Sequence, residues 1–225
     1  MDRSATVQSV GELEASIRDR NRTDRTFMNY LVYVFILDWI TFGLAAIYYY
    51  FRRITRVDAY TNRKRRYHAA LADFTERYAA ASGKPDEVRG DVADLRLGLD
   101  EASRSALKPI GALKTFVLTV VTLGLWSIVL IYQLNRAWND RQEFEAAQMG
   151  RLNKVWIKLG IIAYPVVFTP DPSKRRNFLL NVILVIITLG IWGIVWDYRV
   201  WTDPNSLYPA FHSVEDIVLT IARAA

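Results

Sequence analysis

Three long stretches of the chain carry almost no charge, and this feature limits the folds that are open to it. They cover residues 27–51, 115–134 and 177–200. The first contains a single ionisable acid, Asp38, and the second contains no charged residue. Each reaches the roughly 20 apolar residues that a helix needs to cross a hydrocarbon core about 30 Å thick. The sequence therefore predicts three membrane segments.

The average composition hides this segmentation. The chain has 225 residues, 52% hydrophobic and 23% charged, and nearly all of its 29 Lys and Arg residues lie outside the three stretches. Such a pattern argues against a soluble globular domain, a disordered chain and a fibrous repeat. With no cysteine and only two histidines, the chain lacks the residues of a thiolate or histidine-rich metal site. We expect no metal and no cofactor.

The three stretches share a short repeat, which reads TFGLAAIYYYF, TLGLWSIVLIY and TLGIWGIVWDY. Glycine is a poor helix former, and a threonine hydroxyl can cap the helix that follows it, so the repeat predicts a bend in each stretch. The predicted bend residues are Thr41, Gly43, Thr122, Gly124, Thr188 and Gly190.

Two topologies remain open for these stretches. If all three cross the bilayer, the Lys and Arg residues divide 13 against 16 between the two sides, without the cytoplasmic excess that membrane proteins show. If each folds back as a re-entrant hairpin, all 29 stay on the cytoplasmic side. A straight helix remains the alternative, in which the glycine lets a neighbouring helix approach closely. The charge rule favours hairpins only slightly.

The segments TLGLWSIVLIYQLNRAWND and TLGIWGIVWDYRVWTDPN resemble a family of small, uncharacterised prokaryotic inner-membrane proteins with a TLGIYGxYWxYK-like signature. The likeness covers about half of the chain, and the first repeat departs from it because TFGLAAIYYYFRR lacks the tryptophan. The resemblance implies residence in the cytoplasmic membrane, with most of the polar mass in the cytoplasm. It supplies no catalytic residue.

Two apolar stripes follow the first stretch. One runs from Val57 to Tyr78 in steps of three and four, and the other from Val88 to Ala106, with the turn SGKPDE between them. This spacing predicts an antiparallel helical hairpin of the coiled-coil type in the cytosol. The stripes could pack within one chain, against a second copy in a homo-oligomer, or against a cytosolic protein partner.

A dense group of cations accompanies the first stretch. If one helix continues out of the bilayer, these cations form a basic belt near its surface, at about 1 kcal/mol of attraction per cation to anionic lipid headgroups. No nucleic-acid reading fold surrounds the group, so we expect no nucleic-acid partner. The predicted lipid-headgroup-binding residues are Arg52, Arg53, Arg56, Arg63, Lys64, Arg65 and Arg66.

The remaining parts of the chain are predicted as short amphipathic helices. One spans residues 151–168 and is expected to lie at the membrane interface. Another begins at Ser213, which precedes two acidic residues at an expected helix start. The predicted segments are an amphipathic N-terminal segment (1–26), membrane units (27–51, 110–134 and 177–201), a helical hairpin (52–109), an interfacial connector (135–176) and a C-terminal amphipathic helix (202–225).

Chemistry-bearing motifs are scarce. The sequence contains no nucleophile elbow, phosphate-binding loop or metalloprotease motif, so an enzyme is not expected. Asp38 is the most singular residue, because an ionised carboxylate within an apolar stretch costs several kcal/mol. It either caps backbone amides at the bend or serves an ion pathway.

The sequence as a whole predicts an all-α integral membrane protein with three Thr-x-Gly membrane units, as hairpins or spans, and a cytosolic helical hairpin. The expected function is non-enzymatic self-assembly that organises or curves the bilayer. The first alternative is a small oligomeric channel or transporter component that uses Asp38. The second is a membrane anchor for a cytosolic partner.

Overall fold

The computed structural model describes residues 3–24, 30, 32–42 and 44–225, and within these every regular element is helical. In chain order the elements are α1 (Arg3–Arg18), α2 (Arg20–Thr23), the π-helix η1 (Val32–Leu37), α3 (Asp38–Ile40), α4 (Leu44–Ala81), α5 (Pro85–Arg104), α6 (Ala112–Val121), α7 (Trp126–Leu159), the 3-10 helix η2 (Pro172–Lys174), α8 (Phe178–Ile187) and α9 (Ile191–Ala224).

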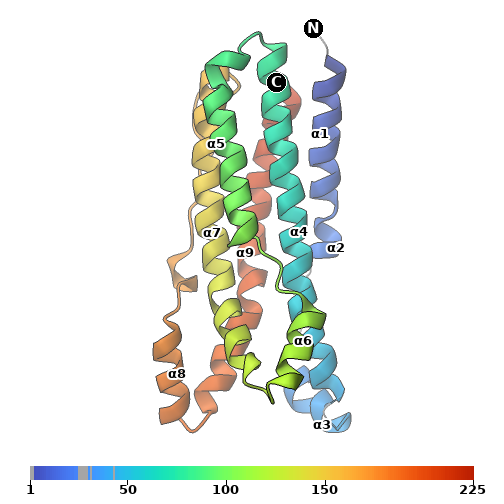
Figure 1. Cartoon of the computed structure of the whole chain (residues 1–225), viewed down its shortest axis with the longest axis vertical. Coiled ribbons are helices and arrows are strands. Elements are labelled where there is room, and N and C mark those ends of the chain that lie inside the picture. The colour runs from blue at the N-terminus through green and yellow to red at the C-terminus, as the bar shows by residue number, and fades with distance from the viewer. Residues whose placement is uncertain (1–2, 25–29, 31, 43) are drawn as a thin grey trace.

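Four long helices, α4, α5, α7 and α9, form an elongated bundle (Figure 1). Helix α4 contacts α1, α5 and α7, and α9 contacts α1 and α7. The short helices α3, α6 and α8 lie at the same end of the bundle, α8 on one side and α3 and α6 on the other, and the turn between α4 and α5 lies at the opposite end (Figure 1). The bundle is therefore polarised, with both chain termini far from the short helices.

The two predicted stripes lie on α4 and α5, which pack side by side and are joined at residues 82–84. Their apolar side chains, such as Leu71 on α4 and Leu95 on α5, are 1% exposed within this one chain. Because α5 also packs on α7, these stripes belong to the interior of the bundle. Self-assembly through the stripes and a cytosolic partner stay predictions.

The prediction that the connector helix lies at a membrane interface is wrong. Helix α7 continues without a break to Leu159, and Leu152 and Trp156 are fully buried. The apolar face read as interfacial belongs to the bundle core. Helix α9 likewise begins far upstream of Ser213 and contains Pro204 and Pro209. Proline usually ends a helix because it lacks a backbone donor, but α9 continues through both prolines.

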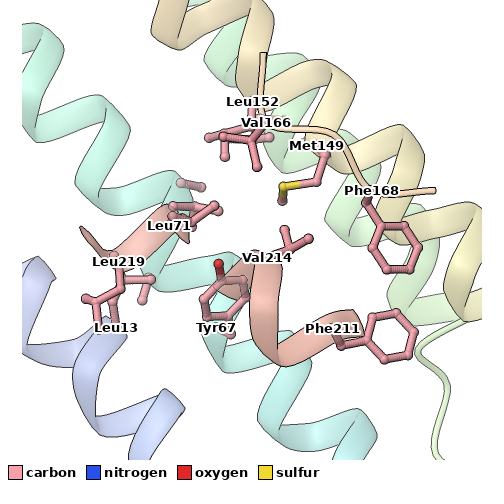
Figure 2. Packing of buried hydrophobic residues seen from close by; sticks show 14 of the residues in the cluster. Leu13, Tyr67, Leu71, Met149, Leu152, Val166, Phe168, Phe211, Val214 and Leu219 are labelled. Atoms are coloured by element: carbon pink, nitrogen blue, oxygen red, sulfur yellow. The ribbon is translucent and has the colours of Figure 1, made fainter. Parts of the chain in front are cut away.

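The segment between α7 and η2 packs its side chains against the core of the bundle. Figure 2 shows Val166 and Phe168 from this segment beside residues of α4, α7 and α9. The side-chain amide of Asn153 donates to the Val166 carbonyl at 2.8 Å, and its oxygen accepts from the Val166 amide at 2.9 Å. The Phe168 ring stacks on Phe211 at 5.1 Å between ring centres.

Among the described residues, no helix combines the length and the apolar character that crossing a bilayer requires. This finding overturns the predicted integral membrane fold with transmembrane helices, and with it the predicted place in an inner membrane. The physical reason is that each apolar stretch is divided. Helices α6 and α8 have 10 residues each, about 15 Å at 1.5 Å per residue.

Candidate functional site

Each of the three Thr-x-Gly repeats forms a tight turn. In the residues that the structure describes, the three turns have the same hydrogen bonds. In each turn the threonine hydroxyl donates to the carbonyl four residues before it, at 2.7 Å, for Thr41, Thr122 and Thr188. The same hydroxyl accepts from the amide four residues after it, at 2.9 Å. One side chain therefore satisfies a group at the end of one helix and a group at the start of the next, which is why the chain reverses there.

The residue after each threonine is apolar, strained and almost fully exposed. Phe42, Leu123 and Leu189 have φ angles of 51°, 49° and 49°, in the left-handed region that disfavours residues with a Cβ. Their exposed fractions are 98%, 95% and 94%. We call these three residues the tip residues. Strained backbone of this kind often occurs at functional sites, and side chains this exposed add nothing to the apolar core.

Thr122→Val tests the role of this hydroxyl. Losing both hydrogen bonds should lower the free energy of unfolding by about 1 kcal/mol, in the range of other helix caps, and should speed hydrogen exchange at the Trp126 amide. Thr55→Val is the matched control, because the Thr55 hydroxyl bonds only to carbonyls on α4. Equal exchange rates at Trp126 in the wild type and in Thr122→Val would contradict the proposed cap.

The apolar surface extends from the tip residues over the adjoining helix turns and ends at a boundary of cations and aromatic rings. No charged residue occurs between Lys114 and Arg136, or between Arg176 and Asp197. Many side chains in these segments are more than half exposed, among them Val120, Val121, Leu125, Ile128, Leu179, Leu180, Ile186, Ile187 and Ile191. This surface together with the tip residues is called the apolar end.

Four cations lie where the apolar end meets the rest of the bundle, and we call them the boundary cations: Arg52, Lys114, Arg136 and Arg199. Each lies within 13 residues of a tip residue along its helix, so less than about 20 Å from it. Arg136 lies over the Tyr132 ring at 5.7 Å, and Arg199 over the Trp192 ring at 5.3 Å. Cations beside amphipathic rings are typical of the zone between lipid headgroups and acyl chains.

The predicted basic belt divides between core and surface, so its reading as one lipid-facing group is wrong. Arg63 and Lys64 are 0% and 1% exposed. A helix turns about 100° per residue, so consecutive cations cannot share one face. The other members lie as follows: Arg52 half-buried, Arg53 paired with Asp197 at 2.5 Å, Arg56 buried and bonded to Asn205 at 2.6 Å, Arg65 exposed, and Arg66 exposed and paired with Asp19 at 2.9 Å.

Arg63 and Lys64 belong to a buried ion-pair cluster that joins four parts of the chain. Arg63 bonds to Asp24 at 2.5 Å and to Glu215 of α9 at 2.9 Å. Lys64 lies 2.8 Å from Glu215 and 2.9 Å from Glu145 of α7. The histidines extend the cluster, His68 to Glu145 at 3.2 Å and His212 to Asp24 at 2.7 Å. Each carboxylate contacts at least one buried cation, and the cluster fixes α4 against α7 and α9.

The cluster holds its carboxylates ionised. Burial alone raises the pKa of Glu145, but Lys64 and His68 outweigh burial and lower the pKa to about 2. For Glu215, burial likewise raises the pKa, and Lys64 and Arg63 together lower it well below its ordinary value of 4.5. The neighbouring cations keep these carboxyl groups deprotonated and make them weak bases. They are therefore poorly suited to act as a general base near neutral pH.

Acid should therefore destabilise the bundle in a defined window. Because the folded-state pKa of Glu145 lies below the ordinary value of 4.5, its contribution is present above pH 4.5 and is lost as the pH falls towards 2. The loss should be on the order of 3 kcal/mol, measured by urea unfolding across this window. In Glu145→Gln, that part of the pH dependence should vanish. A wild-type unfolding free energy that stays constant from pH 5 to pH 2 would contradict the assignment.

Two predicted residues cannot be placed in the site. The side chain of Asp38, at the start of α3, and the whole of Gly43 lie outside the described residues. Gly124 and Gly190 follow the tip residues with φ angles of 92° and 93°. In the part of the chain that the structure describes, no group of three or more His, Asp or Glu side chains is placed to hold a metal ion.

The sequence reading missed the acidic partners of the cluster, Asp24, Glu145 and Glu215. One signal was present, because Lys64 interrupts the apolar stripe of α4 at a position with core spacing. Glu215 similarly lies between Val214 and Val218, which are both buried. A charged residue at a core position of a helix indicates that an opposite charge lies on a neighbouring helix.

No family model, no curated protein and no solved structure matches the chain, so the resemblance to an uncharacterised prokaryotic family stays a prediction.

Proposed function

We propose that the chain binds the surface of a lipid bilayer through its apolar end, with the three tips entering only the facing leaflet, and that it acts without catalysis by changing the shape of that bilayer. The observation that carries this proposal is the set of tip residues. Three apolar side chains, each at least 94% exposed and each in a strained turn, lie at one end of a polarised bundle.

The dimensions of the tips support insertion into a single leaflet. Helices α6 and α8, of 10 residues each, extend about 15 Å, which is half of a hydrocarbon core about 30 Å thick. The proposal thus needs no helix that crosses a bilayer. Above the tips, the boundary cations would meet the headgroups, where each contributes about 1 kcal/mol with anionic lipids.

A lipid surface fits the apolar end better than a protein groove would. The tips project from three separate hairpins, and apolar side chains surround each of them. Acyl chains can close around such separate projections, whereas a protein partner would need a matching hollow for each. Material inserted into one leaflet expands that leaflet relative to the other, and this asymmetry favours curvature.

Site-specific fluorescence tests the proposal, because the chain contains no cysteine. Leu189→Cys places a polarity-sensitive dye at a tip, and Tyr164→Cys places the same dye at a residue that is 85% exposed between α7 and η2. With vesicles containing anionic lipid, the tip dye should shift to the blue and be quenched by spin-labelled acyl chains, while the control dye should not respond. An unresponsive tip dye would overturn the proposal.

Electron microscopy of the same vesicles tests the change of shape separately. At high surface coverage, the wild-type chain should produce smaller or tubular vesicles. If the tip dye reports insertion and the vesicles keep their shape, the binding part of the proposal stands and the curvature part fails.

A further inference from the structure

A polar cavity lies immediately above the apolar end, between α6, α7 and the loop that joins α5 to α6. Its volume is about 530 Å³, within the range of ligand-binding pockets. The lining carries four cations, Lys108, Lys114, Arg136 and Arg141, against one carboxylate, Asp140. The cavity is therefore strongly positive.

Arg141 distinguishes this cavity from an ordinary basic surface. The residue is 2% exposed and lines the cavity. Its guanidinium donates to the Ala137 carbonyl at 2.9 Å and to the Thr61 hydroxyl at 2.7 Å, but it forms no ion pair with any described residue, and its Nε has no hydrogen-bond partner among them. Burial lowers the pKa of Arg141, and the neighbouring groups Tyr60, Tyr208, Asp58 and Asp140 raise it only in part. The guanidinium also lies over the Trp138 ring at 5.0 Å.

The acids near the cavity offset the burial of Arg141 only in part. Asp140 lies 3.7 Å from Arg136, which also donates to the Tyr132 hydroxyl at 2.8 Å. Asp58, the nearest acid on α4, has both carboxylate oxygens occupied, because they accept from the Ile110 and Gly111 amides at 2.6 and 2.9 Å. A buried charged group that lacks a partner is costly unless a ligand supplies one.

We propose that this cavity binds the phosphate group of an anionic phospholipid, with Arg141 and Lys114 as its principal contacts. Guanidinium and phosphate match in charge and in their paired hydrogen-bond geometry. The lipid source follows from position, because the lining also includes Trp126, only three residues from the tip residue Leu123. A phosphate held there would have its acyl chains beside the apolar end. This inference rests on the proposed function and names the lipid group that the chain recognises.

The direct test follows the Arg141 Nε–H resonance by nuclear magnetic resonance in the full chain. Dihexanoyl phosphatidic acid, kept below its micelle concentration, should shift this resonance. Inorganic phosphate and glycerol 3-phosphate should shift it at much higher concentrations only. A resonance that no phosphate compound moves would overturn the site, and equal responses to glycerol 3-phosphate and the short-chain lipid would overturn the lipid as its source.

Vesicle binding gives a second test. Phosphatidylcholine vesicles are prepared with phosphatidic acid or with oleate at equal surface charge, so that only the added anion differs. The wild type should prefer phosphatidic acid by about tenfold, since charge-assisted bonds to a fitted phosphate add to general attraction. Arg141→Gln should lose this preference, whereas Lys84→Gln, in the turn at the opposite end of the bundle, should keep it. An unchanged preference in Arg141→Gln would refute the site.

A variant at exposed positions guards against misfolding. Lys108 and Lys114 are both exposed, so K108Q/K114Q should fold normally while weakening binding to phosphatidic acid vesicles by about fivefold for each cation. Failure of the site and failure of the proposed function remain distinguishable. The short-chain lipid requires no vesicle insertion, and the tip dye requires no phosphate site.

Discussion

Replacing all three tip residues by asparagine, as F42N/L123N/L189N, should weaken binding to anionic lipid vesicles by about four orders of magnitude while making the bundle more stable. Each tip side chain that enters acyl chains contributes about 2 kcal/mol, and three such losses correspond to roughly a 10,000-fold change in the dissociation constant. Vesicle titration measures the binding constant, and urea unfolding measures the stability.

The gain in stability has a separate cause. The tip residues hold φ angles near 50°, where asparagine is tolerated far better than leucine or phenylalanine. Relief of this strain should raise the free energy of unfolding by up to about 1 kcal/mol per tip. Opposite signs for binding and stability separate loss of an interface from general damage to the fold.

The matched control is Tyr164→Asn, which removes a large side chain that is 85% exposed and lies outside the apolar end. It should leave the binding constant unchanged within about twofold. If F42N/L123N/L189N binds vesicles within tenfold of the wild type, the tips are not the lipid contact. If the triple variant is less stable than the wild type, the strain assigned to the tip residues is wrong.

The turns at the tips can be predicted from the sequence better than the packing of the core, because the interactions in the turns are short in range. A threonine hydroxyl such as that of Thr122 bonds only to groups four residues away, so its preference for a bend is legible in a short segment. The length of the helices cannot be predicted from the sequence in this way. An apolar stretch of 20 residues has the same composition whether it forms one helix or two helices of 10, and the predicted integral membrane fold arose from this ambiguity.

The buried positions of Arg63 and Lys64 could not be predicted from the local sequence pattern, because their partners lie far away in the sequence. Arg63 bonds to Glu215, 152 residues away. A run of cations beside an apolar stretch resembles a headgroup-binding belt until the packing of α4 against α7 and α9 shows which side chains face inward. The cavity around Arg141 could not be predicted for the same reason, since α6, α7 and the loop between α5 and α6 together form its walls.

Glu215→Ala should be the most destabilising single substitution at the ion-pair cluster. Glu215 is fully buried and bonds to Arg63 and Lys64 of α4 and to Arg20 of α2. Removing it leaves buried cations with too few acidic partners, which typically costs about 3–5 kcal/mol. This is a large share of the roughly 5–15 kcal/mol by which a domain is stable. Urea unfolding should show a lower midpoint with an unchanged slope.

Asp216→Ala provides the matched control from the adjacent residue. The Asp216 carboxylate also bonds to Arg20, at 2.6 Å, but its side chain is 60% exposed, so its removal should cost less than about 1 kcal/mol. The double variant E215A/K64M should recover part of the loss, because it removes one of the cations left without a partner. Equal unfolding free energies for Glu215→Ala and Asp216→Ala would show that burial does not set the strength of this cluster, and that the register of α4 against α9 depends on apolar packing instead.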